Sequence, residues 1–138
     1  LSRRVPLERQ GLSPKVTAKG ALEVQDGNRL RTVHYLVQER VRGSTLREAG
    51  REELALVRAL FEKLIESRIK LEDRVRMADN IMVGSTRSGK ARRAFVVDAG
   101  EAESVPAPSL MDRLLGRPDP LRTYYDEVYK DLARSLKR

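Results

Sequence analysis

Two short apolar runs separated by a polar turn place the strongest constraint on how this chain can fold. Residues 81–83 and 94–97 are each too short for a helix, and a glycine-containing polar segment joins them. Strand-length apolar runs on either side of such a turn are typical of two antiparallel strands. We therefore predict a β-hairpin with a long turn over residues 81–97.

The turn of this hairpin is close in composition to a phosphate-binding P-loop, since residues 84–90 read GSTRSGK. A P-loop needs Ser or Thr after its lysine to hold magnesium, and here Ala91 follows Lys90. The loop must also open a helix whose amides face the phosphate, but only residues 91–93 precede the next apolar run. We therefore reject the P-loop and predict a hairpin turn.

The N-terminal part of the chain predicts a second pair of strands. Residues 15–24 and 32–41 contain alternating apolar and polar side chains, as expected for half-buried strands. Residues 25–28 separate them as a turn, with Gly27 at a position where a positive φ is convenient.

The remaining periodicity is helical. In residues 52–69 apolar side chains recur three and four positions apart, which predicts one long helix with a broad core face. A short helix is predicted near 110–115 and a final helix over 121–136. Small antiparallel strands followed by helices indicate an α+β fold.

Composition narrows the chemistry that this chain can perform. Its 138 residues carry a net charge of +8, contain no cysteine and include one histidine, His34. A histidine metal cluster, a Ser/His triad and a disulfide framework are therefore not expected. The basic balance favours phosphates, nucleic acids or acidic proteins as partners, although an aromatic content of 4% disfavours stacking on bases. No apolar run is long enough to predict a membrane span.

The ends of the predicted hairpin carry a polar residue each. Asn80 precedes the first apolar run, and Asp98 follows the second in the order Phe-Val-Val-Asp. This arrangement resembles the catalytic-loop end and the metal-binding segment of protein-kinase-like enzymes. The resemblance implies that Asn80 and Asp98 donate oxygen ligands to a Mg²⁺ ion on the phosphates of ATP. The helix predicted at 52–69 would match the scaffold helix before the catalytic loop.

The segment at 34–46, HYLVQERVRGSTL, resembles the last N-lobe strand, the hinge and the first C-lobe turn of the same superfamily. The resemblance implies that Gln38 is the gatekeeper and that the backbone of Glu39 to Val41 meets the adenine. It also makes Lys19, on the preceding strand, a candidate cleft lysine.

The resemblance covers roughly residues 11–100. It implies a kinase-like α+β fold, with a partial N-lobe at 1–41 and a minimal, mainly helical C-lobe at 42–138. The glycine-rich loop and the strand lysine of the family would lie upstream of Gly11, so the chain is similar either to the reduced kinase-like proteins of bacteria or to a fragment of a longer kinase.

The chain departs from the family at the catalytic aspartate. That residue lies five positions before the metal-binding asparagine, where this chain has Val75. Valine cannot accept a proton from a substrate hydroxyl. Asp73 and Asp79 are the nearby carboxylates, and Asp73 is the candidate substitute if the loop is remodelled.

Three hypotheses for function follow. The first is a pseudokinase, or truncated atypical kinase, that binds Mg-ATP and acts through a protein partner. The second is an active atypical bacterial kinase, in which case a secreted effector acting in a host cytosol is one option beside an ordinary cytoplasmic protein. The third is a small basic protein that binds an acidic partner or, less favoured, nucleic acid.

Overall fold

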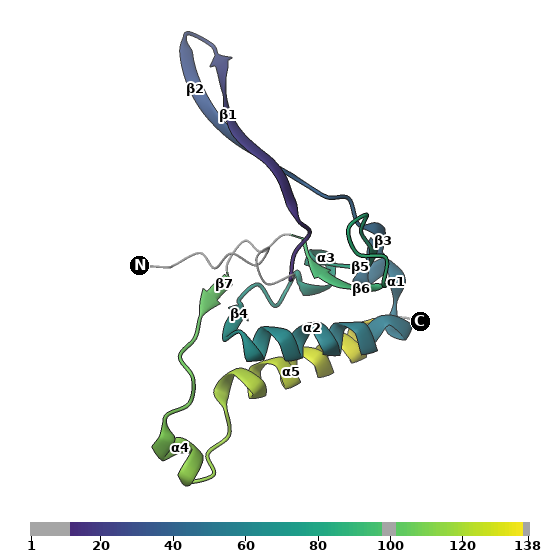
Figure 1. Ribbon diagram of the computed structural model, residues 1–138, viewed down its shortest axis with the longest axis vertical. Coiled ribbons are helices and arrows are strands. Elements are labelled where there is room, and N and C mark those ends of the chain that lie inside the picture. The colour runs from purple at the N-terminus through teal and green to yellow at the C-terminus, as the bar shows by residue number, and fades with distance from the viewer. Residues whose placement is uncertain (1–11, 98–101, 137–138) are drawn as a thin grey trace.

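The computed structural model describes residues 12–97 and 102–136, which form small antiparallel sheets and helices (Figure 1). The α+β class predicted from the sequence is confirmed at this level. No helix within these two ranges is long and apolar enough to cross a membrane. The elements are β1 (Val16–Asp26), β2 (Arg29–Gln38), β3 (Arg42–Thr45), α1 (Leu46–Ala49), α2 (Leu54–Glu66), β4 (Ile69–Leu71), α3 (Met77–Asn80), β5 (Ile81–Ser85), β6 (Arg93–Val96), β7 (Ala102–Ser104), α4 (Leu110–Leu114) and α5 (Pro120–Ser135).

β1 and β2 form a two-stranded antiparallel ribbon that projects from the rest of the molecule (Figure 1). The predicted turn is confirmed, with Gly27 at a φ of 65°. β2 ends at Gln38, before the predicted strand end, because residues 39–41 leave the ribbon as a linker to β3.

One face of the ribbon is apolar and exposed to solvent. Leu22, Val24, Tyr35 and Val37 lie on this face, since alternate residues of paired strands point to the same side. Each of these four side chains is more than two-fifths exposed. A ribbon of two strands is marginal by itself in water, so the body below it provides the stable core.

The predicted hairpin at 81–97 is confirmed as β5 and β6, which pair from Ile81 opposite Val96 to Gly84 opposite Arg93. β5 also pairs with β3, which extends the hairpin to a three-stranded sheet in the order β3-β5-β6. β3 was not predicted, because its four residues, Arg-Gly-Ser-Thr, have no apolar alternation.

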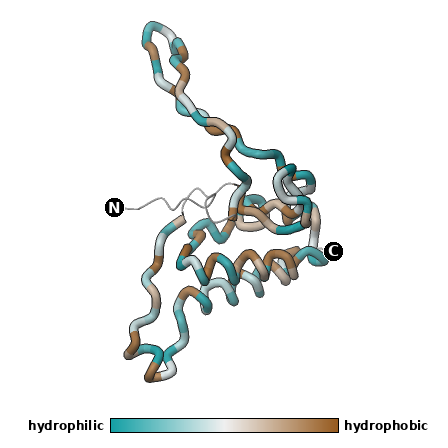
Figure 2. Tube along the Cα trace, viewed as in Figure 1, coloured by the Kyte–Doolittle hydropathy of each residue, from teal (hydrophilic) through white to brown (hydrophobic). Residues whose placement is uncertain are grey.

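The core lies between this sheet, α2 and α5. Hydrophobic residues recur along α2 at the centre of the body (Figure 2). The predicted helical stripe of the last helix is confirmed, and its five residues are buried in the same cluster. They are Leu121, Tyr125, Val128, Leu132 and Leu136.

α2 is shorter than the helix predicted over 52–69. A 3-10 turn occupies Arg51–Glu53, α2 ends at Glu66, and Ile69 already belongs to β4. Arg68 breaks the helix, because its backbone takes a positive φ of 57°, which helical residues do not adopt.

The side chain of Arg68 explains why this backbone conformation is retained. It donates two hydrogen bonds to the Asp119 carboxylate, at 2.6 and 3.0 Å, and a third to the carbonyl of Pro106 at 3.0 Å. Arg68 therefore holds both ends of a projecting arm, residues 106–119, that contains α4. Because the Asp119 carboxylate also accepts the amide of Leu121, the same pair fixes the start of α5.

Replacing Asp119 with asparagine is expected to lower the free energy of unfolding at pH 7 by about 1 to 2 kcal/mol. Asparagine can still cap α5, so the lost stability is that of the charged pair. The hydrogen bonds from Arg68 hold the pKa of the Asp119 carboxyl below its ordinary value near 3.8. The contribution of this carboxylate to stability is therefore complete above about pH 5 and is lost as the pH falls through the lowered folded-state pKa.

Urea unfolding of the starting protein and the D119N variant at several pH values measures this difference. The gap between the two curves should close as the pH falls from about 5 toward 2. A gap that stays constant over this range would show that the carboxylate charge contributes nothing to the clamp.

Candidate functional site

At the base of the β5–β6 hairpin, the predicted metal ligand Asn80 lies next to Val97. Val97 directly precedes the other predicted ligand, Asp98, in the sequence. Asn80 ends α3, and its carbonyl accepts the amide of Val97 at 2.9 Å. The carboxamide of Asn80 makes no hydrogen bond to another described residue and is half-buried. Asp98, the second predicted ligand, lies outside the described residues. Val97 is its immediate neighbour in the sequence.

The linker predicted as the hinge lies at the opposite end of β5. Arg42, which follows the linker, is paired with Ser85, whereas Asn80 precedes the other end of the strand. Five residues of extended chain separate these ends by about 17 Å. The linker and Asn80 therefore lie near opposite ends of β5.

One face of this sheet packs into the main core cluster, and the other carries Met82 and, opposite it on β6, the fully buried Phe95. Ile81, Val83, Ala94 and Val96 belong to the main core cluster. Met82 points to the other face, because side chains alternate along a strand, and it remains half-buried. The alternation of side-chain direction along residues 81–83 was the sequence signal that could have placed Met82 on the face opposite Ile81 and Val83.

The side chains of the linker hold the base of the ribbon. Gln38 donates from Nε2 to the carbonyl of Pro14 at 3.1 Å, and the Glu39 carboxylate accepts the hydroxyl of Ser88 at 2.8 Å. The hydrogen bond from Ser88 lowers the pKa of Glu39, while partial burial opposes the shift. Val41 is buried. The amide of Glu39 donates to the carbonyl of Lys15 at 2.8 Å, and the side chain of Arg40 is exposed.

Lys19 lies on the ribbon, where it is paired with Leu36, two residues before Gln38. Its side chain is exposed and lines a shallow hollow beside His34 and Tyr35. The structure does not bring Lys19 into contact with Asn80.

The carboxylates of the loop before Asn80 have structural partners. Asp73 accepts the backbone amide of Arg76 through Oδ1 at 3.2 Å, and Asp79 pairs with Arg47 at 2.8 Å. Val75, where the resemblance to kinase-like enzymes predicts a catalytic aspartate, is 89% exposed. The side chain of Val75 is therefore open to solvent, and it has no group that could accept a proton.

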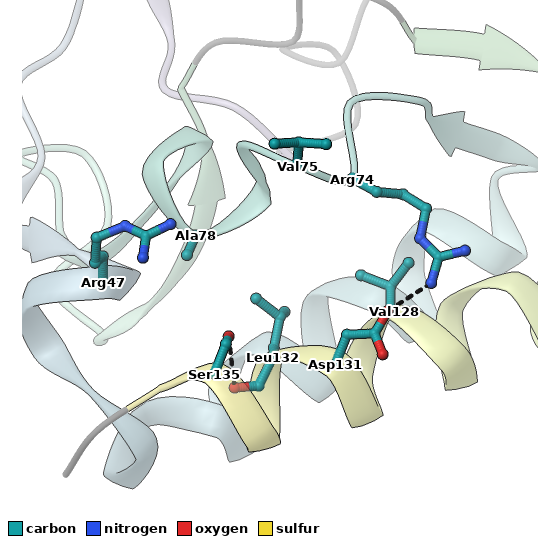
Figure 3. A pocket seen from close by; sticks show the side chains of 8 residues that line it. All are labelled: Arg47, Arg74, Val75, Ala78, Val128, Asp131, Leu132 and Ser135. Atoms are coloured by element: carbon teal, nitrogen blue, oxygen red, sulfur yellow. Dashed lines mark hydrogen bonds and ion pairs between the residues drawn. The ribbon is translucent and has the colours of Figure 1, made fainter.

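A cavity of about 230 Å³ lies next to Val75, between this loop and α5 (Figure 3). Ala78, Val128 and Leu132 contribute apolar surface to its lining, and Arg47 and Arg74 contribute guanidinium groups. Arg74 reaches across to Asp131 on α5 at 2.7 Å. The volume is below the range of about 300–1,000 Å³ typical of small-molecule pockets, so it does not suit a nucleotide.

Within residues 12–97 and 102–136 there is no group of three or more His, Asp or Glu side chains that could hold a metal ion. The predicted pair is a different kind of site, because Asn80 is a carboxamide and Asp98 lies outside these ranges. The chain matches no protein-family model, no curated protein and no solved structure.

Proposed function

We propose that this protein is a kinase-like pseudokinase that binds Mg-ATP along β5, between the linker at 39–41 and the hairpin base at Asn80, and acts by binding another protein. The adenine would lie against the linker backbone and Met82. The phosphates would extend along the strand toward Asn80 and Asp98.

The hydrogen bond from the Val97 amide to the Asn80 carbonyl is the observation that carries this proposal. It joins the backbone at the two ends of the hairpin, immediately before Ile81 and immediately after Val96. The resemblance stated above assigns metal ligands to Asn80 and to Asp98, the residue after Val97. The separation of about 17 Å between linker and hairpin base is also of the order of an extended nucleoside triphosphate.

The residues present fit magnesium by their donor chemistry. A carboxamide oxygen and a carboxylate oxygen are ligands of the kind that Mg²⁺ accepts, with the nucleotide phosphates and water completing its shell. The carboxamide of Asn80 has no competing hydrogen bond among the described residues, so it is available for this role. Bound magnesium would neutralise phosphate charge.

The loop before Asn80 supports binding rather than phosphoryl transfer. Val75 offers no group that accepts a proton, and Asp73 is used as an acceptor for the amide of Arg76. An active atypical kinase would have to release Asp73 from this turn. The proposal therefore ranks the active enzyme second.

Addition of Mg-ATP is expected to raise the melting temperature by about 5 °C at a ligand concentration about tenfold above Kd, because binding to the folded state alone shifts the unfolding equilibrium. The shift should be absent in Asn80→Ala and Asp98→Ala and retained in Asp73→Ala. Differential scanning fluorimetry with Mg-ATP, ATP alone and Mg²⁺ alone measures it.

The Asp73→Ala variant is the matched control, since it removes a carboxylate of the same loop that the proposal does not use for binding. No shift in the starting protein would reject nucleotide binding. A full shift in both Asn80→Ala and Asp98→Ala would reject this site. ATP turnover that disappears in Asp73→Ala would favour the active-kinase alternative.

A further inference from the structure

Cations without ion-pair partners collect where the linker meets the β5–β6 turn. We define this basic corner as Lys15, Arg40, Arg42, Arg87 and Lys90, all of which are exposed. Within the described chain, none of these five residues forms a salt bridge.

Three backbone and side-chain contacts bring the segments of the basic corner together. Ser88 on the turn donates to the Glu39 carboxylate at 2.8 Å. Arg42 is paired with Ser85, at the start of the turn. The amide of Glu39 donates to the carbonyl of Lys15 at 2.8 Å. The segments that carry the five exposed cations therefore lie next to one another, although they come from three separate parts of the sequence.

Many arginines elsewhere in the described chain are paired with carboxylates, but isolated arginines such as Arg51, Arg76 and Arg113 are not; the basic corner differs in that its unpaired cations lie on neighbouring segments. Such pairs join α1 to α3, α2 to α5, and the projecting arm to the core. The arginines in such pairs include Arg47, Arg58, Arg68, Arg74, Arg92, Arg117 and Arg122.

Glu39 is the acidic residue of the linker and turn segments, and its charge, which interacts with Lys15, offsets only part of the basic corner. Its carboxylate accepts the Ser88 hydroxyl, which lowers its pKa and keeps it charged. One carboxylate among five cations leaves a local excess of positive charge. Such an excess attracts an anionic partner and raises its association rate.

The turn that carries two of these cations is ordered by its own hydrogen bonds. Thr86 is buried, its amide donates to the carbonyl of Gly89 at 3.1 Å, and its hydroxyl accepts the Gly89 amide at 3.3 Å. Arg87 and Lys90 are therefore presented on a fixed backbone, and a ligand does not have to order the turn when it binds.

We infer that the basic corner binds an acidic segment of a partner protein, with aspartate or glutamate side chains pairing with Arg40, Arg42, Arg87 and Lys90. Single-stranded nucleic acid is disfavoured, because neither the linker at 39–42 nor the turn at 85–90 contains an aromatic ring for base stacking. This inference rests on the protein-binding part of the proposed function and names its surface. It does not depend on nucleotide binding at Asn80.

A fluorescein-labelled hexaglutamate peptide tests the inference by fluorescence anisotropy with the full chain. Reversal of charge in the double variant Arg87→Glu/Lys90→Glu should weaken binding by about tenfold or more, and the affinity of the starting protein should fall as salt rises from about 50 to 200 mM. The double variant Arg40→Gln/Arg42→Gln should also weaken peptide binding, because it removes the two cations at the linker.

The matched control is Arg113→Glu/Lys130→Glu, which makes the same change in net charge at exposed cations of α4 and α5. It should change the affinity by less than about twofold. Equal weakening by both charge-reversal variants, or no binding by the starting protein, would overturn the inference. Tighter binding of a short DNA duplex, lost in the same corner variants, would overturn the assignment to a protein partner.

The thermal shift with Mg-ATP separates this inference from the nucleotide site. Arg87→Glu/Lys90→Glu should keep the shift, while Asp98→Ala should keep peptide binding. A variant that loses both properties through misfolding is recognised by a lowered melting temperature without ligand.

Discussion

Replacing Gly84 with alanine is expected to lower the free energy of unfolding by about 3 kcal/mol and the melting temperature by about 10 °C. Gly84 in β5 lies opposite Gly43 in β3. A Cβ atom built on Gly84 would lie 2.1 Å from the carbonyl oxygen of Arg42. The neighbour is backbone rather than a flexible side chain, so β3 must move away from β5. Urea and thermal unfolding measure the loss.

Gly89→Ala is the control for this prediction. A Cβ atom at Gly89 would lie 3.8 Å from the Thr86 hydroxyl, which is an ordinary contact distance. Its cost should therefore stay within about 0.5 kcal/mol. Gly43→Ala should behave like Gly84→Ala, since its Cβ would lie 1.9 Å from the carbonyl oxygen of Val83. Equal stability of Gly84→Ala and Gly89→Ala would refute the close approach of the two strands.

Removal of the hydroxyl in Tyr125→Phe is expected to cost about 2 to 3 kcal/mol. This hydroxyl is fully buried, donates to the carbonyl of Ile69 at 2.7 Å and accepts the amide of Leu71 at 2.9 Å. Burial raises the pKa of Tyr125, so the group stays neutral and keeps its proton for donation. Phenylalanine would leave both backbone groups of β4 without this partner in the core, which costs their desolvation.

Tyr129→Phe is the matched control on the same helix. Tyr129 is half-buried, and its hydroxyl has no hydrogen bond to the described residues, so the change should cost less than about 0.5 kcal/mol. Chemical unfolding monitored by circular dichroism compares the two variants. Similar curves for both would contradict the role of Tyr125 in attaching β4 to α5.

Elements with a strong period could be predicted from the sequence. α2 and α5 carry apolar side chains three and four residues apart over several turns, and the β5–β6 hairpin has two apolar runs around a polar turn. The ribbon was predictable for the same reason, with Gly27 marking its turn. In these segments the local pattern and the tertiary contacts favour the same structure.

The short strands could not be predicted. β3, β4 and β7 have four or three residues each, which is too few for alternation to be recognised. β4 pairs with β7, more than thirty residues later in the chain, so its conformation depends on a distant partner. The break at Arg68 depends on Asp119 in the same way, because a positive φ at arginine has no local sequence signal.

The place of the candidate site in the sequence could be predicted, but the hydrogen bonds of its side chains could not. The sequence pattern located Asn80 at the hairpin base, and the structure agrees. It did not indicate that Glu39 accepts a hydrogen bond from Ser88 or that Asp73 is held by the amide of Arg76. In both contacts the conformation of a turn decides which hydroxyl or amide lies next to the carboxylate.

The most direct test of nucleotide binding along β5 is paramagnetic broadening by Mn²⁺, a stand-in for Mg²⁺, with ATP in an isotope-labelled sample. Broadening falls steeply with distance from the ion. The account predicts strong loss of signal for the carboxamide of Asn80 and the amide of Val97, with little change at Gly116 beside α4. Unchanged signals at Asn80 and Val97, or equal broadening at all three positions, would contradict it.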